Sequence, residues 1–336
     1  MADIDRILAT LPMPYPKGYV CYRAAERLSL NGRLDDPAWK AAPWTPHFVD
    51  IEGAAKPNPR FRTRAKMLWD DECFYIGAEL EEPHVWATLT EHDSVIFQDN
   101  DFEVFIDPDG DNHQYYEIEI NALNTEWDLR LVKPYRDGGP ALNEWEIPGF
   151  RSAVHIDGTL NDPSDRDRGW TVEMAFPWKV LAEFANRPSP PREGDHWRAN
   201  FSRVEWHVTT ENGRYVKVPH QPEDNWVWSP QGVIDMHRPE RWGYVQFTRE
   251  TAVSGRRIPF LPDPAHSIRE RLHRVYYAQR LYRAEHGRWA ENLAELHLEH
   301  PDGISLNPTA DGYVASGPDS QDQPWHIRED SRIWRE

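Results

Sequence analysis

Short runs of alternating apolar and polar residues recur between residues 20 and 248, separated by turn-forming residues. Because successive side chains on a β-strand point to opposite faces, such runs predict strands with one face in a core. Their number and spacing favour an all-β fold, an antiparallel β-sandwich of immunoglobulin-like or jelly-roll-like type, over βαβ units. Only residues 178–185 look helical in this region. The predicted strands are residues 66–68, 74–80, 101–107, 115–121, 127–132, 153–156, 170–177, 197–205, 215–218 and 243–248.

The pattern changes after a Pro- and Arg-containing linker at residues 249–265. Over residues 266–286 apolar and aromatic residues recur at helical spacing, and the segment ends at Gly287, a common helix terminator. A second short helix is predicted at 292–297, and strands at 304–306, 313–315 and 325–327. We therefore divide the chain into a Pro-rich lead-in (1–19), the sandwich (20–248), the linker, and a small helical α+β appendage (266–336).

Aromatic content and charge narrow the class of partner. The chain has 16 Trp beside 13 Tyr and 12 Phe. Most of these rings belong in a core, but so many Trp indicate that some serve as flat stacking platforms for sugars or bases. A formal net charge of −18 and the lack of a Lys/Arg stripe exclude nucleic acid, whose phosphates would be repelled. No run of 18 apolar residues occurs, so membrane insertion is not expected.

Five motifs carry a resemblance to a known family. They are LNGRLDDPAW (30–39), WDDECFYI (69–76), DNDFEVFIDP (99–108), GWTVEMAFPW (169–178) and PERWGY (239–244). In this order they resemble the family 9 carbohydrate-binding modules. The resemblance implies a β-sandwich that binds a polysaccharide or oligosaccharide, in an extracellular or periplasmic setting. The N-terminal residues lack the basic and apolar regions of a secretion signal, which leaves a cytoplasmic location open.

The sugar-binding members of that family hold a sugar between two aromatic rings, with a carboxylate and an arginine on its hydroxyls. Transferred to this sequence, the carboxylate falls on Glu103 and one ring near Phe97. The arginine falls near Glu119, which reverses the charge, and the second ring falls near Met236. Further candidate platforms are Trp127, Trp226 and Trp228, and further candidate hydrogen-bonding groups are Asn121, Arg203 and Glu205.

A row of carboxylates is the first candidate for chemistry. On their predicted strands, Asp101 and Glu103 share a face, as do Glu117 and Glu119. If the strands pair, Glu103 lies opposite Glu119 or Glu117. Closely placed carboxylates push their pKa values apart and can act as acid and base in glycoside hydrolysis. The alternatives are a polar face of the sandwich or a set of metal ligands.

Two further segments combine aromatic and polar residues. Arg203 and Glu205 would share a strand face and either bind sugar hydroxyls or a uronate, or form a structural ion pair. In the segment 225–232, Trp226 and Trp228 point to one face if the chain is extended, as a ligand-facing loop or as a cap on the core. His237 is a candidate general base or metal ligand, although a lone histidine is more often neither.

The segment DPDGDNH (107–113) places oxygen ligands at alternate positions around a glycine. This pattern suits a structural Ca²⁺ bound by Asp107, Asp109 and Asp111, as in similar modules, and it equally suits an Asx-rich turn. The leading hypothesis is a non-catalytic carbohydrate-binding protein of polysaccharide degradation. The alternatives are a glycoside hydrolase or lyase that uses Glu103, Glu119 and His237, and a structural or partner-binding sandwich.

Overall fold

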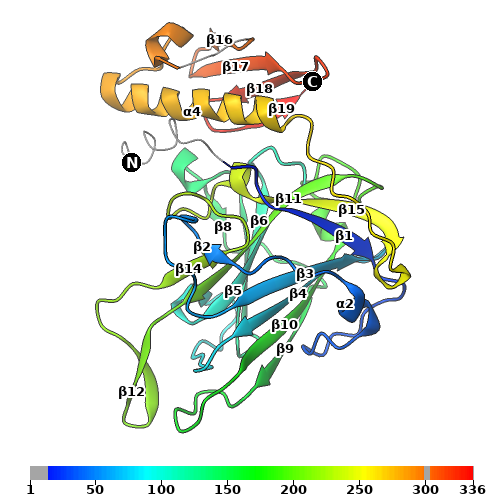
Figure 1. The fold of residues 1–336 in the computed structure, drawn as a ribbon. Helices are drawn as coiled ribbons and strands as arrows, with labels where there is room; N and C mark the ends of the chain where they lie inside the picture. Colours follow the sequence, from blue (N-terminus) through cyan, green and yellow to red (C-terminus); the bar gives the residue numbers. More distant parts are fainter. Residues whose placement is uncertain (1–13, 299–302, 336) are drawn as a thin grey trace.

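Two parts of the chain are stacked in the computed structural model, which describes residues 14–298 and 303–335 (Figure 1). A large β-sandwich lies below, and helix α4 (His266–His286) lies across its upper end with a small sheet on its far side. The predicted lead-in falls mostly on residues 1–13, which lie outside the described residues. Among the described residues no helix is both long and apolar enough to cross a membrane.

The sandwich contains strands throughout, with two short helices and a few single 3₁₀ turns. The helices are α2 (Pro37–Ala41) and α3 (Trp178–Leu181). Its strands are β1 (Gly18–Arg23), β2 (Val49–Asp50), β3 (Thr63–Trp69), β4 (Cys73–Glu81), β5 (Asp101–Asp107), β6 (Tyr115–Asn121), β7 (Glu126–Leu131), β8 (Ala141–Leu142), β9 (Arg151–Asp157), β10 (Gly169–Pro177), β11 (His196–Glu205), β12 (Val208–Glu211), β13 (Arg214–Lys217), β14 (Asp224–Val227) and β15 (Gly243–Thr251).

Most of these strands pair in one continuous path, β8–β7–β6–β5–β11–β15–β1–β3–β4–β10–β9, with β14 and β2 added beside β11. The path folds over on itself, so that β5 and β6 face β3, β4 and β10 across a shared apolar core. The pairing is antiparallel, as predicted, with one exception in the described ranges. Strand β1 runs parallel to both β15 and β3, where it links the two halves. The predicted all-β sandwich with a small α+β part is confirmed.

The main core explains why the alternating runs form strands. One face of β5 contributes Phe102 and Val104, and the opposite layer contributes Ile76 and Phe176, all fully buried. Several Trp join them, so that most of the tryptophan content serves packing, as expected for large rings in a sheet core. The fully buried tryptophans are Trp39, Trp69, Trp197, Trp228 and Trp242.

The first motif of the sequence folds around a single carboxylate. Glu173 on β10 accepts hydrogen bonds from the backbone N–H groups of Asn31 (2.7 Å), Gly32 (3.1 Å) and Leu34 (2.9 Å). Gly32 has φ +78°, and a Cβ there would lie 2.5 Å from the carbonyl carbon of Val154. Only glycine suits both the left-handed backbone and this close approach. The motif thus anchors the segment before α2 to the sheet.

The C-terminal part packs α4 against the antiparallel sheet β16–β17–β18–β19. Its strands are β16 (Ser305–Pro308), β17 (Tyr313–Pro318), β18 (Pro324–Arg328) and β19 (Ile333–Arg335). A core of its own includes Leu272, Tyr276, Tyr313 and Ile327. Helix α4 has the predicted bounds and ends at Gly287, whose φ of +71° and N–H bond to Arg283 complete a glycine C-cap.

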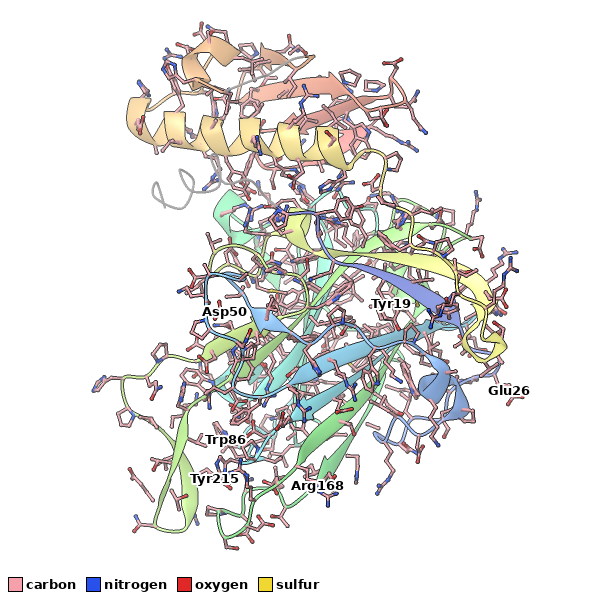
Figure 2. All side chains as sticks on the ribbon, in the orientation of Figure 1. Tyr19, Glu26, Asp50, Trp86, Arg168 and Tyr215 are labelled. Carbon is pink, nitrogen blue, oxygen red and sulfur yellow. The ribbon has the colours of Figure 1, made fainter. Side chains whose placement is uncertain are left out.

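This appendage is joined to the sandwich by direct polar contacts. The Asn112 side chain donates to the Ser331 carbonyl (2.9 Å), and the Ile333 N–H donates to the Asp111 carbonyl (3.1 Å). Arg238 of the sandwich contacts the Tyr277 hydroxyl of α4 at 3.2 Å. At the opposite end of the molecule, the β12–β13 hairpin projects away from the sheets and carries Tyr215 (Figure 2).

Candidate functional site

A cleft of about 260 Å³ opens on the face of β5, β6 and β7 that points away from the main core. Alternate residues of these strands reach it, because strand side chains alternate between the two faces. Strand β5 contributes Glu103 and Phe105, and β6 contributes Glu117 and Glu119. The remaining lining comes from β7, β11, β14 and several connecting segments, and comprises Ile51, Phe97, Trp127, Tyr135, Val204, Glu223, Asn225, Ile234, Asp235, Met236 and His237.

The register of β5 and β6 sets the carboxylates side by side. Glu103 is paired directly with Glu119, and Phe105 with Glu117. Oxygens of Asp101, Glu103 and Glu119 all lie within 4.8 Å of one another. The sequence-based prediction that Glu103 lies opposite one of the two glutamates is therefore confirmed. In the described part of the chain, no Lys or Arg lines this cleft.

Burial without a cation favours the protonated form of these carboxyls. Burial raises the pKa of Glu103 to about 7. Burial, followed by the charge of Glu103, raises the pKa values of Glu117 and Glu119 well above their usual range. At neutral pH the cleft therefore holds carboxyl groups that can donate as well as accept hydrogen bonds.

Two carboxyl oxygens in this row are buried with no hydrogen-bond partner among the described residues, Glu117 Oε2 and Asp101 Oδ2. Their neighbours are satisfied: Glu119 accepts from the Phe97 N–H (2.8 Å), and Asp101 Oδ1 accepts from the Val204 N–H (3.1 Å). A buried polar atom left unpaired costs about 1–3 kcal/mol. Glu117, which lines the cleft, thus offers an unused acceptor to a ligand.

Aromatic side chains form the walls of the cleft. The half-buried rings of Phe97 and Trp127 lie with centroids 6.5 Å apart and planes at 32°. Phe97 is held in place through its carbonyl, which accepts from Trp206 Nε1 at 2.8 Å. Tyr135 is 52% exposed and packs edge-on against His237, with centroids 4.5 Å apart. Phe97 and Trp127 are therefore where the prediction placed them, in one cleft with Glu103, Glu119 and Met236.

His237 lines the same cleft, beside Tyr115. Its Nδ1 lies 3.0 Å from the Tyr115 hydroxyl. Burial lowers the pKa of His237 to about 4, so the imidazole is neutral at physiological pH. A neutral histidine can accept or donate one hydrogen bond, but it does not offset the negative charge of the carboxylates.

The structure corrects the interpretation of Trp226 and Trp228 as ligand-facing platforms. Both are buried in the main core, at 2% and 1% exposure. Trp228 stacks on Phe201 with centroids 5.6 Å apart, and Trp226 packs edge-on against Phe61. The start of the segment that looked like a loop belongs to strand β14, which pairs with β11, and the Trp228 N–H just after it donates to the Phe201 carbonyl of β11 (3.1 Å). This pairing is consistent with both rings lying in the core.

Arg203, Glu205 and Asn121 also lie outside the cleft. Arg203 is fully buried and contacts Glu82 and Glu205, each at 2.7 Å. Asn121 is fully buried, and its side-chain oxygen accepts from the N–H groups of Leu123 and Thr125 at the turn after β6. These residues stabilise the sandwich and are not available to a ligand, which corrects their assignment as ligand-binding groups.

The aspartates of the segment 107–113 lie where the sandwich meets the appendage. One oxygen from each of Asp107, Asp109 and Asp111 lies within 4.8 Å of the others. Burial raises all three pKa values, and repulsion between the carboxylates adds to the rise at Asp107 and Asp109. Asp107 accepts from the N–H groups of Gly110 (2.9 Å) and Asn112 (3.0 Å), so the segment is also an Asx-rich turn. The residue types and spacing fit a hard cation.

Sequence reasoning missed several residues that line the cleft. Tyr135, Glu223, Ile234 and Asp235 come from loops, where no periodicity indicates which way a side chain points. The one available signal was local: Tyr135 follows Pro134 in a loop after a predicted strand, and an aromatic residue in a loop is unusual unless it packs or binds.

Comparisons with known proteins agree with this architecture. Residues 30–190 match the family described as "Carbohydrate family 9 binding domain-like". Over 117 residues, 35% of this chain, the sequence is 26% identical to the exoglucanase XynX of Acetivibrio thermocellus. The matched segment spans only 9% of that enzyme.

Solved structures with the same sandwich include a putative carbohydrate-binding protein from Bacteroides uniformis, with a TM-score of 0.50 and 16% identity, covering 69% of this chain and 99% of that one. A family 9 carbohydrate-binding module from Caldicellulosiruptor kristjanssonii in complex with cellotriose gives a TM-score of 0.46 at 16% identity, covering 73% of this chain and 100% of that one. At 16% identity the likeness to the Bacteroides uniformis protein concerns the fold alone.

Proposed function

This chain carries a family 9 carbohydrate-binding module-like sandwich, and from that premise we propose that its cleft binds a neutral saccharide without cleaving it. The observation that carries the proposal is the unpaired, buried Glu117 oxygen in a row of carboxyls walled by Phe97 and Trp127. Sugar rings stack on aromatic faces, and their hydroxyls hydrogen-bond to carboxyl groups at the side.

Charge and size limit the saccharide. No lysine or arginine lines the described cleft to pair with the charge of a uronate or a sulfated sugar, which favours neutral glycans. The volume of about 260 Å³ is slightly below that of typical ligand pockets, which have about 300–1,000 Å³. This fits one or two sugar residues, such as the end of a chain, and not a long segment laid along a surface.

Calorimetric titration with glucose, cellotriose and an oligogalacturonate tests this proposal. We expect binding of at least one neutral sugar and none of the uronate. Trp127→Ala should weaken binding by about 10-fold or more, since it removes a stacking wall. Trp44→Ala is a matched control, because Trp44 is partly exposed and contacts Arg64 and Lys66 away from the cleft. Failure of the full chain to bind any neutral glycan would favour a structural or partner-binding role.

A second candidate, glycan cleavage, is favoured by one observation: a carboxyl with a pKa of about 7 beside another carboxyl. Against it, Glu103 and Glu119 sit on adjacent strands of one sheet, on the same side of any ligand. An acid and its partner must flank the scissile bond. Incubation with oligosaccharides should leave them intact; shortened or unsaturated products that disappear in Glu103→Gln would establish cleavage.

We also propose that Asp107, Asp109 and Asp111 hold a structural Ca²⁺. One oxygen from each of the three carboxyls lies within 4.8 Å of the others, and a bound cation would favour their charged form, which burial alone disfavours. Added Ca²⁺ should then raise the melting temperature of chelator-treated protein, and Asp109→Asn should reduce that gain. An equal gain in both proteins would assign the Ca²⁺ effect to another site.

A further inference from the structure

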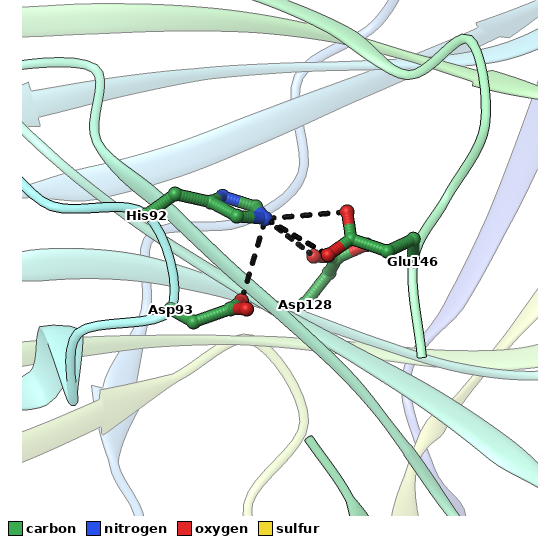
Figure 3. A group of neighbouring side chains, drawn as sticks. All are labelled: His92, Asp93, Asp128 and Glu146. Carbon is green, nitrogen blue, oxygen red and sulfur yellow. Dashed lines mark hydrogen bonds and ion pairs between the residues drawn. The ribbon is translucent and has the colours of Figure 1, made fainter. Parts of the chain in front are cut away.

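Four side chains that could coordinate a metal ion lie together outside the motifs of the sequence, on or near the segments that carry Phe97 and Trp127. His92 and Asp93 precede the turn Ile96–Gln98, Asp128 is on β7, and Glu146 follows β8. Figure 3 shows the four side chains converging around the His92 ring. His92 Nε2 lies 3.2 Å from Glu146 Oε2, 3.4 Å from Asp93 Oδ1 and 3.8 Å from Asp128 Oδ1. One ligand atom from each residue lies within 4.8 Å of all the others.

Asp128 supplies an independent observation at this cluster. Its side chain is only 7% exposed, and its Oδ1 is buried with no hydrogen-bond partner in residues 14–298 and 303–335. Its other oxygen, Oδ2, is satisfied by the Ile147 N–H at 2.6 Å. Oδ1 is therefore a buried acceptor without a partner at the edge of the cluster. Folded proteins normally avoid such an atom unless a proton donor or a cation lies next to it.

The charge of the cluster points to a cation. Three carboxylates surround one imidazole, and the half-buried Glu126 adds a fourth nearby. Even with His92 protonated, two negative charges of the four-residue cluster remain uncompensated. A divalent ion bound to neutral His92 would leave one negative charge uncompensated instead of two.

The spacing also suits a small tetrahedral ion. Zinc bonds to His nitrogen and carboxylate oxygen are about 2.0–2.2 Å long, which places tetrahedral ligands about 3.3–3.6 Å apart. The three separations from His92 Nε2 are 3.2, 3.4 and 3.8 Å. The side chains of His92, Asp93 and Glu146 are 43%, 36% and 58% exposed, so they are accessible to an ion and free to close on it. Ca²⁺ instead prefers six to eight oxygen ligands.

We propose that His92, Asp93, Asp128 and Glu146 bind one divalent transition-metal ion, with Zn²⁺ as the best match for one nitrogen and three oxygen ligands. The ion would tie the segment that leads to Phe97 to strand β7, which carries Trp127 next to Asp128. The metal would therefore be structural, since all four positions are filled by side chains. The competing account is that protonated His92 alone serves as the counter-ion of the carboxylates.

The test is Zn²⁺ titration of the full chain after treatment with a chelator, followed by calorimetry and by the absorption spectrum of the Co²⁺-substituted protein. We expect one equivalent of Zn²⁺ and the intense visible bands of tetrahedral Co²⁺. His92→Ala and Asp128→Asn should each weaken binding by more than about 100-fold, beyond the losses typical of outer-sphere changes. Asp128→Asn keeps an oxygen for the Ile147 N–H and so tests the ligand rather than the fold.

Matched controls are Glu144→Gln and His47→Ala, which change an exposed glutamate two residues from Glu146 and an exposed histidine elsewhere. Both should bind Zn²⁺ as the unmodified chain does. Two outcomes would overturn the proposal: no Zn²⁺ uptake by the unmodified chain, or equal uptake in His92→Ala. Zn²⁺ held by the aspartates at 107–111 would persist in His92→Ala as a separate equivalent. None of these readouts involves a saccharide, so the result is independent of the proposed function.

Discussion

Two groups of buried carboxylates in the same sandwich have opposite surroundings. Around Arg203, the carboxylates of Glu82 and Glu205 are matched by a guanidinium that also donates to Thr63 Oγ1 and the Glu81 carbonyl. In the cleft, Glu103, Glu117 and Glu119 have no cation, and one oxygen of Glu117 has no partner in the described structure. Burial alone therefore does not distinguish structure from function. A buried carboxylate with its partner in place stabilises the fold, and one without a partner is available for a ligand.

The largest expected effect comes from breaking the paired group. Arg203→Met should lower the free energy of unfolding by about 3–5 kcal/mol, because it leaves two buried carboxylates without their cation. Urea denaturation measures the loss. As a control, Arg62→Met removes an arginine that is 72% exposed and pairs with Glu81, which should cost at most about 1 kcal/mol. Similar losses in both variants would show that the Arg203 group is not the structural element described.

The unpaired carboxyls of the cleft should make the free energy of unfolding depend on pH. The pKa of Glu103 is about 7 in the folded protein and near 4.5 in the unfolded chain, so the folded state retains a proton that the unfolded state releases. Through Glu103 alone, the free energy of unfolding should therefore fall by up to about 3 kcal/mol as pH rises from 4.5 to 7.

Denaturation curves of the unmodified chain and of Glu103→Gln across this range measure the effect. The amide introduced by this substitution does not titrate. The stability of the variant relative to the unmodified chain should therefore increase as pH rises. Parallel stability profiles for the two proteins would contradict the raised pKa.

The smallest expected effect tests a single atom of the unpaired group, Glu117 Oε2. Glu117→Gln should change the free energy of unfolding by no more than about 1 kcal/mol, because the amide keeps the shape and no partner is lost. Affinity for a neutral glycan should fall by about 10-fold, or about 1.4 kcal/mol, if that oxygen accepts a sugar hydroxyl. Calorimetric titration gives the affinity. Unchanged binding would remove Glu117 from the site.

The sequence predicted the fold well because periodicity reports which face is buried. The bounds of β5, β6 and α4 match their predicted ranges, and the register that places Glu103 opposite Glu119 follows from the shared strand faces. Periodicity did not predict strand β1. Its short sequence is almost entirely hydrophobic and does not alternate, and it pairs in parallel with a strand far away in the sequence. Periodicity also failed at β14, where the prolines and asparagine around Trp226 resemble a loop.

The site was only partly predictable, for a physical reason. Alternation identifies two faces but not which one is covered, so Trp226, Trp228 and Arg203 were assigned to a ligand and lie in the core. Tyr135 and the His92 cluster depend on loops, whose positions follow from packing and not from spacing. The predicted residues that do share the cleft are Phe97, Glu103, Glu119, Trp127, Met236 and His237, and three of them, Glu103, Glu119 and Trp127, lie on predicted strands whose alternation fixes the direction of the side chain.

Residues 233–237 connect the cleft to the appendage, so the two parts of the chain are not independent modules. Val233 is buried in the core of the appendage, while Asp235 and His237, only a few residues later, line the cleft. Arg136 donates to the His237 carbonyl and also contacts the Tyr276 hydroxyl of α4. The sandwich is therefore not a self-contained module that could be exchanged between proteins. A minimal fragment cut in the linker at 249–265 would lose the support that α4 gives to one wall of the cleft.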